Sequence, residues 1–296
     1  MKGPSVSGSS SGSSSSATPY LQVAPLALIM IAMVGIPLAT VVLLSFWESD
    51  GILIYPTYNL QNYIDVLTSP VTLSLFLKTL KFASITLIFT AVIGFTCSYF
   101  LVFHVRNLRW QIALFLLCTI PFWTSNIIRM VSWIPFLGRE GLFNTLLIEA
   151  GIISQPLDVL LFSDFSVILT YIHLYTLFMI VPIFNSMAKI NPNLIEAARD
   201  AGASSFQILR YIIIPLSKTG LALGTIFVVT LVMGDFFAVR VMSGGQSASV
   251  VSAMKNEIDQ LYYPQASAMA VLLVIVVLIM VSAVLRIVDI RSELAR

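Results

Sequence analysis

Two charged side chains, Arg129 and Asp235, stand inside long apolar stretches of this 296-residue chain. A charge in membrane hydrocarbon is costly, so such residues face the interior of a helix bundle or water. The Asp235 carboxylate could attract a cation, and neighbouring aromatic rings could add cation–π contacts. Alternatively, Arg129 and Asp235 form a structural ion pair. The sequence does not separate these two interpretations.

Polar and aromatic residues accompany Arg129 at helical spacing. Phe122, Asn126, Arg129 and Trp133 recur at intervals that would place them on one face of a continuous helix. We interpret this face as part of a cavity that contains Trp123 or Trp133. The alternative is that the aromatic residues are interface anchors or packing residues.

The next apolar stretch carries a second aromatic face. Tyr171, Tyr175 and Phe178 share that face, whereas His173 lies on another, where we expect a structural histidine. Together these stretches predict a substrate pathway. The predicted pathway residues are Trp123, Asn126, Arg129, Trp133, Tyr171, Tyr175, Asp235 and Phe236.

A polar segment, residues 191–215, separates two of the apolar stretches. Asn191 can cap a helix that starts at Pro192, because the first helical position needs no amide donor. Gly202 supplies a left-handed stop, and Ser204 begins a capping box for a second helix. Two short helices joined at a glycine are therefore expected. Apolar residues continue along the second helix as a stripe of Phe206, Leu209 and Ile213.

The same segment resembles the EAA loop of ABC-importer permeases. That pattern is Glu-Ala-Ala, three residues, Gly, nine residues, Ile, one residue and Leu-Pro. The matching residues are Glu196, Ala197, Ala198, Gly202, Ile212, Ile214 and Pro215. Every spacing fits, and the only departure is Ile214 in place of Leu.

The resemblance implies that residues 190–218 form a cytoplasmic coupling loop that docks on an ATPase subunit. The alanines would permit close backbone approach, and the charged residues would orient the partner. The alternative is an ordinary amphipathic connector between membrane helices. The predicted coupling residues are Glu196, Ala197, Ala198, Arg199, Asp200, Gly202, Ala203 and Pro215.

Further motifs resemble the permeases of spermidine/putrescine importers. They are Pro121–Arg129, Gly138–Asn144, Gly234-Asp235-Phe236 and Gly244-Gly245, and the resemblance covers nearly all of the chain after Tyr20. It implies a polyamine or a related cationic or amino-acid-like solute as substrate. The implied partners are an ATPase dimer, a homologous but different permease subunit and an extracytoplasmic solute-binding protein, all at the bacterial inner membrane.

The composition requires a membrane protein, since 58% of residues are hydrophobic, 10% are charged and the mean hydropathy is +0.94. Alternation with a period of two residues is absent, so we predict an all-α polytopic fold of the type I ABC-importer permease kind. Ten of the 16 Lys and Arg residues lie in segments that are cytoplasmic if both termini are inside. Six stretches are long enough to span: 21–46, 74–103, 111–135, 166–188, 219–241 and 266–288.

The expected organisation is a disordered, Ser/Gly-rich cytoplasmic tail over 1–20, a permease domain over 21–290 and a short tail over 291–296. Short helices are predicted at 142–149, against the outer face, and near 252–261. Lys78 and Lys81 begin the second span, where we expect their ammonium groups to reach the external surface and its lipid headgroups.

Some chemistry is not expected of this chain. It lacks the Gly-x-x-x-x-Gly-Lys-[Ser/Thr] sequence of a P-loop, so ATP and Mg are assigned to the partner ATPase, with no cofactor and no catalysis here. Its histidines and its two cysteines, Cys97 and Cys118, are scattered, so no metal site is expected. Nothing indicates nucleic-acid binding. The alternative function is an ion-coupled secondary transporter, which would show broken midplane helices that the sequence does not reveal.

Overall fold

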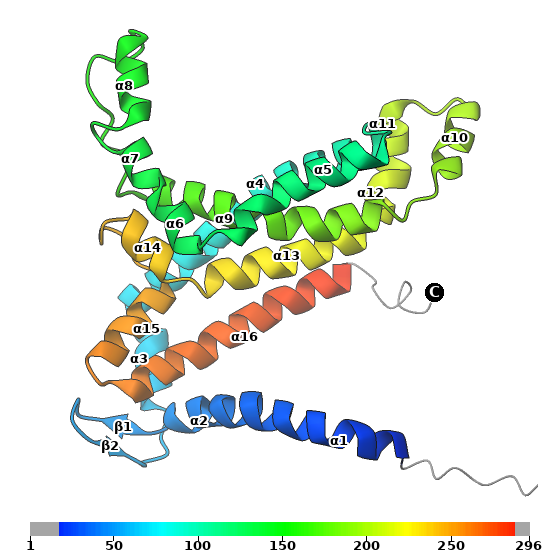
Figure 1. Ribbon diagram of the computed structural model, residues 1–296. Coiled ribbons are helices and arrows are strands. Elements are labelled where there is room, and N and C mark those ends of the chain that lie inside the picture. The colour runs from blue at the N-terminus through cyan, green and yellow to red at the C-terminus, as the bar shows by residue number, and fades with distance from the viewer. Residues whose placement is uncertain (1–17, 288–296) are drawn as a thin grey trace, which may run out of the picture.

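The computed structural model describes residues 18–287, which are predominantly helical (Figure 1). The tails predicted at 1–20 and 291–296 lie outside these residues, except that 18–20 already belong to the first helix. One end of the bundle, the α10 end, carries α10 to α12 and the limits of the described chain at both termini (Figure 1). The opposite end, the α8 end, carries α3, α8, α14 and α15.

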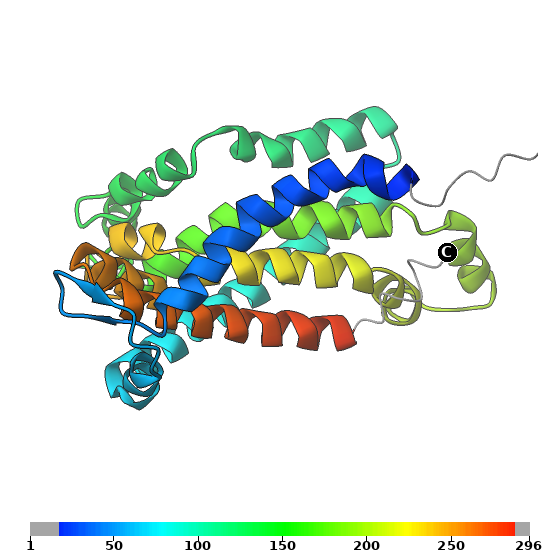
Figure 2. The ribbon, with the colours of Figure 1, turned by 90° about the horizontal axis from the view of Figure 1, so that it is seen from below.

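The first span is a helix with a wider turn in its middle. It consists of α1 (Thr18–Met30), a π-helical turn (Ile31–Gly35) and α2 (Ile36–Leu44). No side chain from 23 to 44 is fully buried, and the span packs mainly where α2 meets α16. Figure 2 shows it running diagonally across the long helices.

A short antiparallel hairpin follows the first span. Strands β1 (Glu48–Ser49) and β2 (Ile54–Tyr55) pair, and α3 (Gln61–Thr68) comes next. Asp50 closes the turn because its carboxylate accepts from the backbone N–H of Leu53 and of Ile52. These bonds hold the pKa of Asp50 below its usual value.

Three long helices form the core, and small residues let them approach closely. These are α4 (Pro70–Phe103), α9 (Asp164–Met187) and α13 (Lys218–Met233). Gly220 and Gly224, one turn apart on α13, face α9. A Cβ on Gly220 would lie 2.4 Å from the carbonyl oxygen of Pro182. Such glycine pairs bring membrane helices together.

The last helix, α16 (Tyr263–Ile287), completes the set of unbroken spans. In the described chain, four unbroken helices are long and apolar enough to cross a membrane. The number rises to six if each of two bent pairs is one span. The structure therefore fits the six predicted spans, with two of them broken.

The third predicted span, 111–135, is not one helix. It consists of α5 (Leu108–Thr119), a 3-10 turn (Ile120–Trp123), α6 (Asn126–Val131) and α7 (Trp133–Leu137), with a 93° bend before Asn126. Pro121 lacks an amide donor, Thr124 is extended and the Ser125 hydroxyl caps the new helix. The expected continuous face is wrong, because Phe122 precedes the break.

The fifth predicted span, 219–241, is also interrupted. Helix α13 ends at Met233, and α14 (Phe237–Met242) begins after a non-helical connection that contains Asp235. At its other end, α13 meets α11 and α12 at a bend of 62°. Broken helices are thus present, contrary to the sequence-based expectation that they are absent.

The chain leaves the bundle between α7 and α9. Helix α8 (Leu142–Glu149) has the predicted bounds, but it packs on α7 and projects from the bundle instead of lying against it (Figure 1). Asn144, fully buried, donates to the carbonyls of Gly138 and Leu157 and accepts from the Leu157 N–H. The Asn144 side chain therefore links the segment that leaves the bundle at Gly138 to the segment that returns at Leu157.

Helix α15 (Val250–Asp259) forms near the predicted place, starting two residues earlier. The ammonium groups of Lys78 and Lys81, which were expected to extend to the external surface, form ion pairs with Asp164 at the start of α9. The distances are 3.2 and 3.5 Å. The Ser247 hydroxyl donates to the same carboxylate at 2.9 Å. Asp164 thus connects α4, α9 and the connection that follows α14.

Candidate functional site

The polar segment folds as its sequence predicts. Helix α10 (Pro192–Asp200) is capped by the Asn191 side chain, which accepts from the Asn193 N–H at 3.0 Å. Gly202 ends it with φ of +82°, the left-handed conformation. The Ser204 and Gln207 capping box then begins α11 (Ser205–Ile208), as expected.

A π-helical turn (Leu209–Ile213) and α12 (Ile214–Leu216) carry the chain back to the bundle. The predicted stripe is wrong for Phe206, which is 68% exposed, whereas Ile213 is buried as predicted; Ile208 takes the place of Phe206 on the buried side. Pro215 lies directly before the 62° bend, in agreement with its predicted role as a helix breaker or kink.

Helix α10 presents charge to its surroundings and attaches through few residues. Ile195 is buried and Ala198 is half-buried, so these side chains hold the helix to its neighbours. Glu196, Arg199 and Asp200 are exposed, and none of them forms an ion pair with another residue in the 18–287 range. The remaining predicted coupling residues are the exposed Ala197 and Gly202, the half-buried Ala203, and Pro215.

The structure brings two predicted pathway tyrosines onto Asp235. The Tyr175 hydroxyl donates to Oδ2 of Asp235 at 2.7 Å, and the Tyr171 hydroxyl lies 3.5 Å from the Asp235 carbonyl oxygen. The two rings stack at 5.5 Å, and both are buried. The shared face predicted for these residues and Phe178 is confirmed.

Asp235 is half-buried and not enclosed, and its second oxygen supports the backbone. Oδ1 accepts from the Ala238 N–H at 2.8 Å, in the first turn of α14. The carboxylate therefore satisfies an amide that the break in the fifth span leaves without a helical partner. Ser249, which is not among the predicted pathway residues, donates to the Asp235 carbonyl at 3.4 Å. Ser249 lies directly before α15 and caps it by accepting from the Ser252 N–H, so a serine at a helix start is the signal that could have found it.

Arg129 is buried, with 8% of its surface exposed. It donates to the Asn126 side chain, while its Nε finds no partner in the described chain. The ion pair with Asp235 is not formed, because within 18–287 no carboxylate comes within 4.0 Å of the guanidinium. The carboxylate of Asp235 is bound by Tyr175 instead.

The predicted tryptophans lie in different places. Trp133 Nε1 donates to Nδ1 of His173 at 2.9 Å, which gives His173 the structural bond expected of it. Trp123 is 86% exposed and lies before the 93° bend, so the structure does not place it with the tyrosines. Phe236 is half-buried beside Asp235 and makes an edge contact with Phe237.

The chain matches no protein-family model. It is similar to the spermidine/putrescine transport system permease protein PotB of Haemophilus influenzae, with 31% identity over 77% of this chain and 79% of that protein. The permease protein PotC of the corresponding Escherichia coli system is 30% identical over 36% of this chain and 40% of that protein.

Two crystal structures of a bacterial ABC transporter for alginate, one in complex with a periplasmic protein, contain a chain of the same fold. The TM-score is 0.71 for both, with identities of 15% and 14%. The matches cover 91% and 90% of this chain and 94% and 92% of those chains. The fold is therefore that of an ABC-transporter permease, a multi-pass protein of the inner membrane. Within this class, the chain belongs to the PotB family of permease proteins.

Proposed function

We propose that this chain forms half of the translocation pathway of an ABC importer for polyamines such as putrescine and spermidine. The observation that carries the proposal is the 31% identity to PotB, together with a carboxylate, Asp235, in the non-helical connection after α13 and among aromatic rings. A carboxylate in surroundings of low dielectric attracts an ammonium group more strongly than it does in water. The Tyr175 hydroxyl orients the carboxylate, and Phe236 would add a ring face for cation–π contact.

ATP hydrolysis belongs, in this proposal, to a dimer of separate ATPase chains that hold ATP and Mg. Helix α10 supports the assignment because it stands at one end of the bundle with exposed charges and a glycine stop (Figure 1). A coupling helix needs such a protruding, chemically distinct surface for its partner. Movement of the ATPase dimer would displace α10 and, through α11 and α12, the bent end of α13.

Two further partners complete the proposed importer. A second permease subunit, homologous but different, would supply the other half of the pathway; PotC, a permease of the E. coli system, resembles this chain over 36% of its length. A soluble binding protein would deliver solute at the α8 end, where α3, α8, α14 and α15 gather (Figure 1). One solved transporter of this fold is in complex with a periplasmic protein, which supports this part of the proposal.

Reconstitution tests the energy source and the substrate together. The chain, its partner permease, the ATPase and the binding protein would be placed in vesicles, and uptake of labelled putrescine and spermidine would be measured. We expect uptake only with ATP on the ATPase side. Alginate oligosaccharide and glutamate serve as anionic controls that should not be transported.

The alternative, an ion-coupled secondary transporter, gains one observation, since two spans are broken. Uptake in the same reconstituted vesicles distinguishes this alternative from the importer. Uptake that follows an imposed proton or sodium gradient and ignores ATP would replace the importer proposal.

A further inference from the structure

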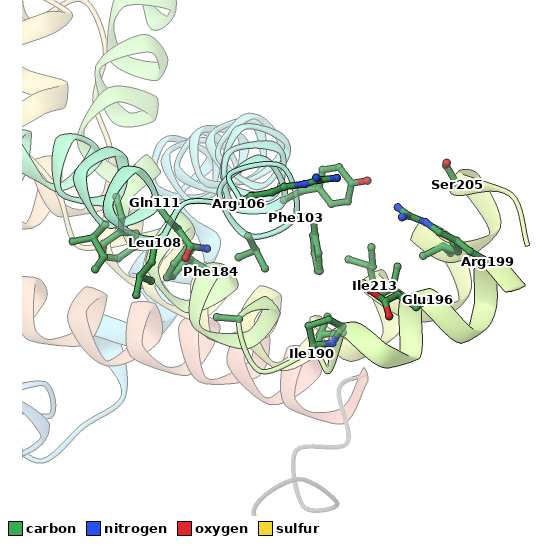
Figure 3. Close-up of a pocket in the computed structure, with 18 of the residues that line it drawn as sticks. Phe103, Arg106, Leu108, Gln111, Phe184, Ile190, Glu196, Arg199, Ser205 and Ile213 are labelled. Carbon is green, nitrogen blue, oxygen red and sulfur yellow. The ribbon is translucent and has the colours of Figure 1, made fainter.

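A cavity of about 790 Å³ lies at the α10 end of the bundle (Figure 3). One wall comes from the end of α4 and from α5, and the opposite wall from the end of α9 and from α10 to the π-helical turn after α11. The α4–α5 connection and α10 thus face each other across it. Nothing in the proposed transport cycle uses this space.

The cavity lining changes from apolar to charged along its length. Phe115 of α5 and Phe184 of α9 meet with ring centroids 4.5 Å apart, and Ile112 and Leu116 continue this wall. Both aliphatic side chains are about half exposed on α5, so this part of the cavity adjoins an exposed apolar face of the span.

Two guanidinium groups occupy the other part. Arg106 comes from the α4–α5 connection and Arg199 from α10, and their side chains extend toward one another across the cavity (Figure 3). Neither forms an ion pair with a carboxylate among residues 18–287. Glu196 also lines the cavity, which leaves one net positive charge on its rim.

We propose that this cavity binds one anionic phospholipid, with the phosphate between Arg106 and Arg199 and an acyl chain along Ile112 and Leu116. Arginine donates paired hydrogen bonds to phosphate oxygens, and basic pockets between membrane helices bind anionic headgroups. The order of the lining, cationic at the helix ends and apolar along the span, matches the order of groups in a phospholipid. A free phosphate would use the arginines alone and leave the apolar part empty.

The site also bears on the proposed function, because α10 forms one of its walls. A lipid bound between Arg106 and Arg199 would hold α10 at a fixed distance from the bundle. This consequence rests on the coupling role proposed for α10, whereas lipid binding itself does not.

The test counts retained lipids on the assembled transporter by native mass spectrometry, after purification in mild detergent and addition of phosphatidylglycerol or phosphatidylcholine. Arg106→Gln removes one headgroup contact, and Ala188→Phe fills the cavity while keeping both arginines. We expect each to weaken phosphatidylglycerol binding about tenfold. Arg109→Gln is the matched control, since Arg109 is an exposed arginine near by that does not line the cavity.

Three results would overturn the proposal: equal loss in Arg109→Gln, phosphatidylcholine retained as well as phosphatidylglycerol, or no loss in either cavity variant. Displacement by inorganic phosphate at a concentration equal to that of the lipid would assign the site to a soluble anion instead. Co-purification of the ATPase and ATP-dependent uptake are recorded separately. If no ATPase binds, the lipid count is made on the full chain alone, so failure of the importer proposal remains distinguishable.

Discussion

The two oxygens of Asp235 have different partners, and this difference decides which substitution tests its role. Oδ1 accepts from a backbone amide of α14, and Oδ2 accepts from Tyr175. A truncation would remove a cap and a charge together. Asparagine can still cap the helix, and its amide can donate to the Tyr175 hydroxyl in a reversed hydrogen bond, so it removes the charge while both contacts remain.

We therefore expect Asp235→Asn to reduce polyamine uptake by about tenfold or more, since bonds to charged groups contribute about 1.5–3 kcal/mol, and to leave the yield of assembled complex unchanged. Asp235→Ala should lower both, because the lost cap costs about 1 kcal/mol. Uptake in vesicles and complex yield are measured for both variants. Normal transport by Asp235→Asn would end the cation-pathway proposal.

Arg129→Gln provides the comparison for that experiment. Because Arg129 and Asp235 form no ion pair, the double variant should show the sum of the two single effects on assembly. If each single variant lost assembly and the double variant restored it, the two side chains would act as a structural pair after all.

Among the secondary-structure elements, the features that could be predicted from the sequence are those that depend on neighbouring residues, namely helix caps and helix ends. The caps at Asn191 and Ser204 and the stop at Gly202 depend on neighbouring residues, and all three formed. The breaks at Thr124 and after Met233 were missed because each is only two or three polar or small residues long and apolar residues resume directly after it. Hydropathy measures how well each residue tolerates lipid. It does not show where a side-chain hydroxyl or carboxylate takes the place of a backbone hydrogen-bond partner.

The site shows the same division. The shared face of Tyr171 and Tyr175 follows from spacing within one helix and could be predicted. The bond from Tyr175 to Asp235 joins α9 to the non-helical connection after α13, sixty positions later, and the end of α13 places the carboxylate there. Likewise, Trp123 could not be separated from Trp133 until the 93° bend was seen.

Gly202→Val should uncouple the importer without preventing membrane insertion. A β-branched residue is strained at φ of +82°, by about 1–3 kcal/mol, and the strain would re-aim α10. Co-purification of the ATPase and substrate-stimulated hydrolysis should both fall. Gly202→Asn, which tolerates the left-handed region better, is the control and should retain most of both signals. Wild-type coupling in the valine variant would contradict the assignment of α10.

Gly220→Ala should destabilise the fold, because its Cβ would meet the backbone of α9 at Pro182 and Ile183. Overpacking of this kind costs about 1–3 kcal/mol. Gly35→Ala is the matched control, since its Cβ would meet only one side-chain atom, at an ordinary 3.7 Å. The melting temperature of the detergent-purified protein should fall for the first variant alone. Equal behaviour of the two variants would mean that α9 and α13 do not pack closely at Gly220.

The whole molecule has a polarity that can be tested directly. The α10 end and the α8 end lie at opposite ends of the long helices, so they should face different sides of the membrane (Figure 1). After replacement of Cys97 and Cys118 by serine, a single cysteine at Asn193 should be labelled only from the cytoplasm. One at Asn256 should be labelled only from outside. Both positions are exposed and avoid the capping residue Ser204. Reversed labelling would overturn the inside location of the termini.

The buried side-chain amide of Asn144 should affect the rate at which the chain around α8 opens locally. Local openings of a folded chain range from nearly free to as costly as global unfolding, and hydrogen exchange reports them. Because α8 packs mainly on α7, the excursion from Gly138 to Leu157 can open while the spans stay closed. The Asn144 side chain bonds to Gly138 and to Leu157, one at each end of the excursion. The whole excursion should therefore open in a single step. Amides of this excursion should therefore exchange with one shared rate, slower than a free loop and faster than α9.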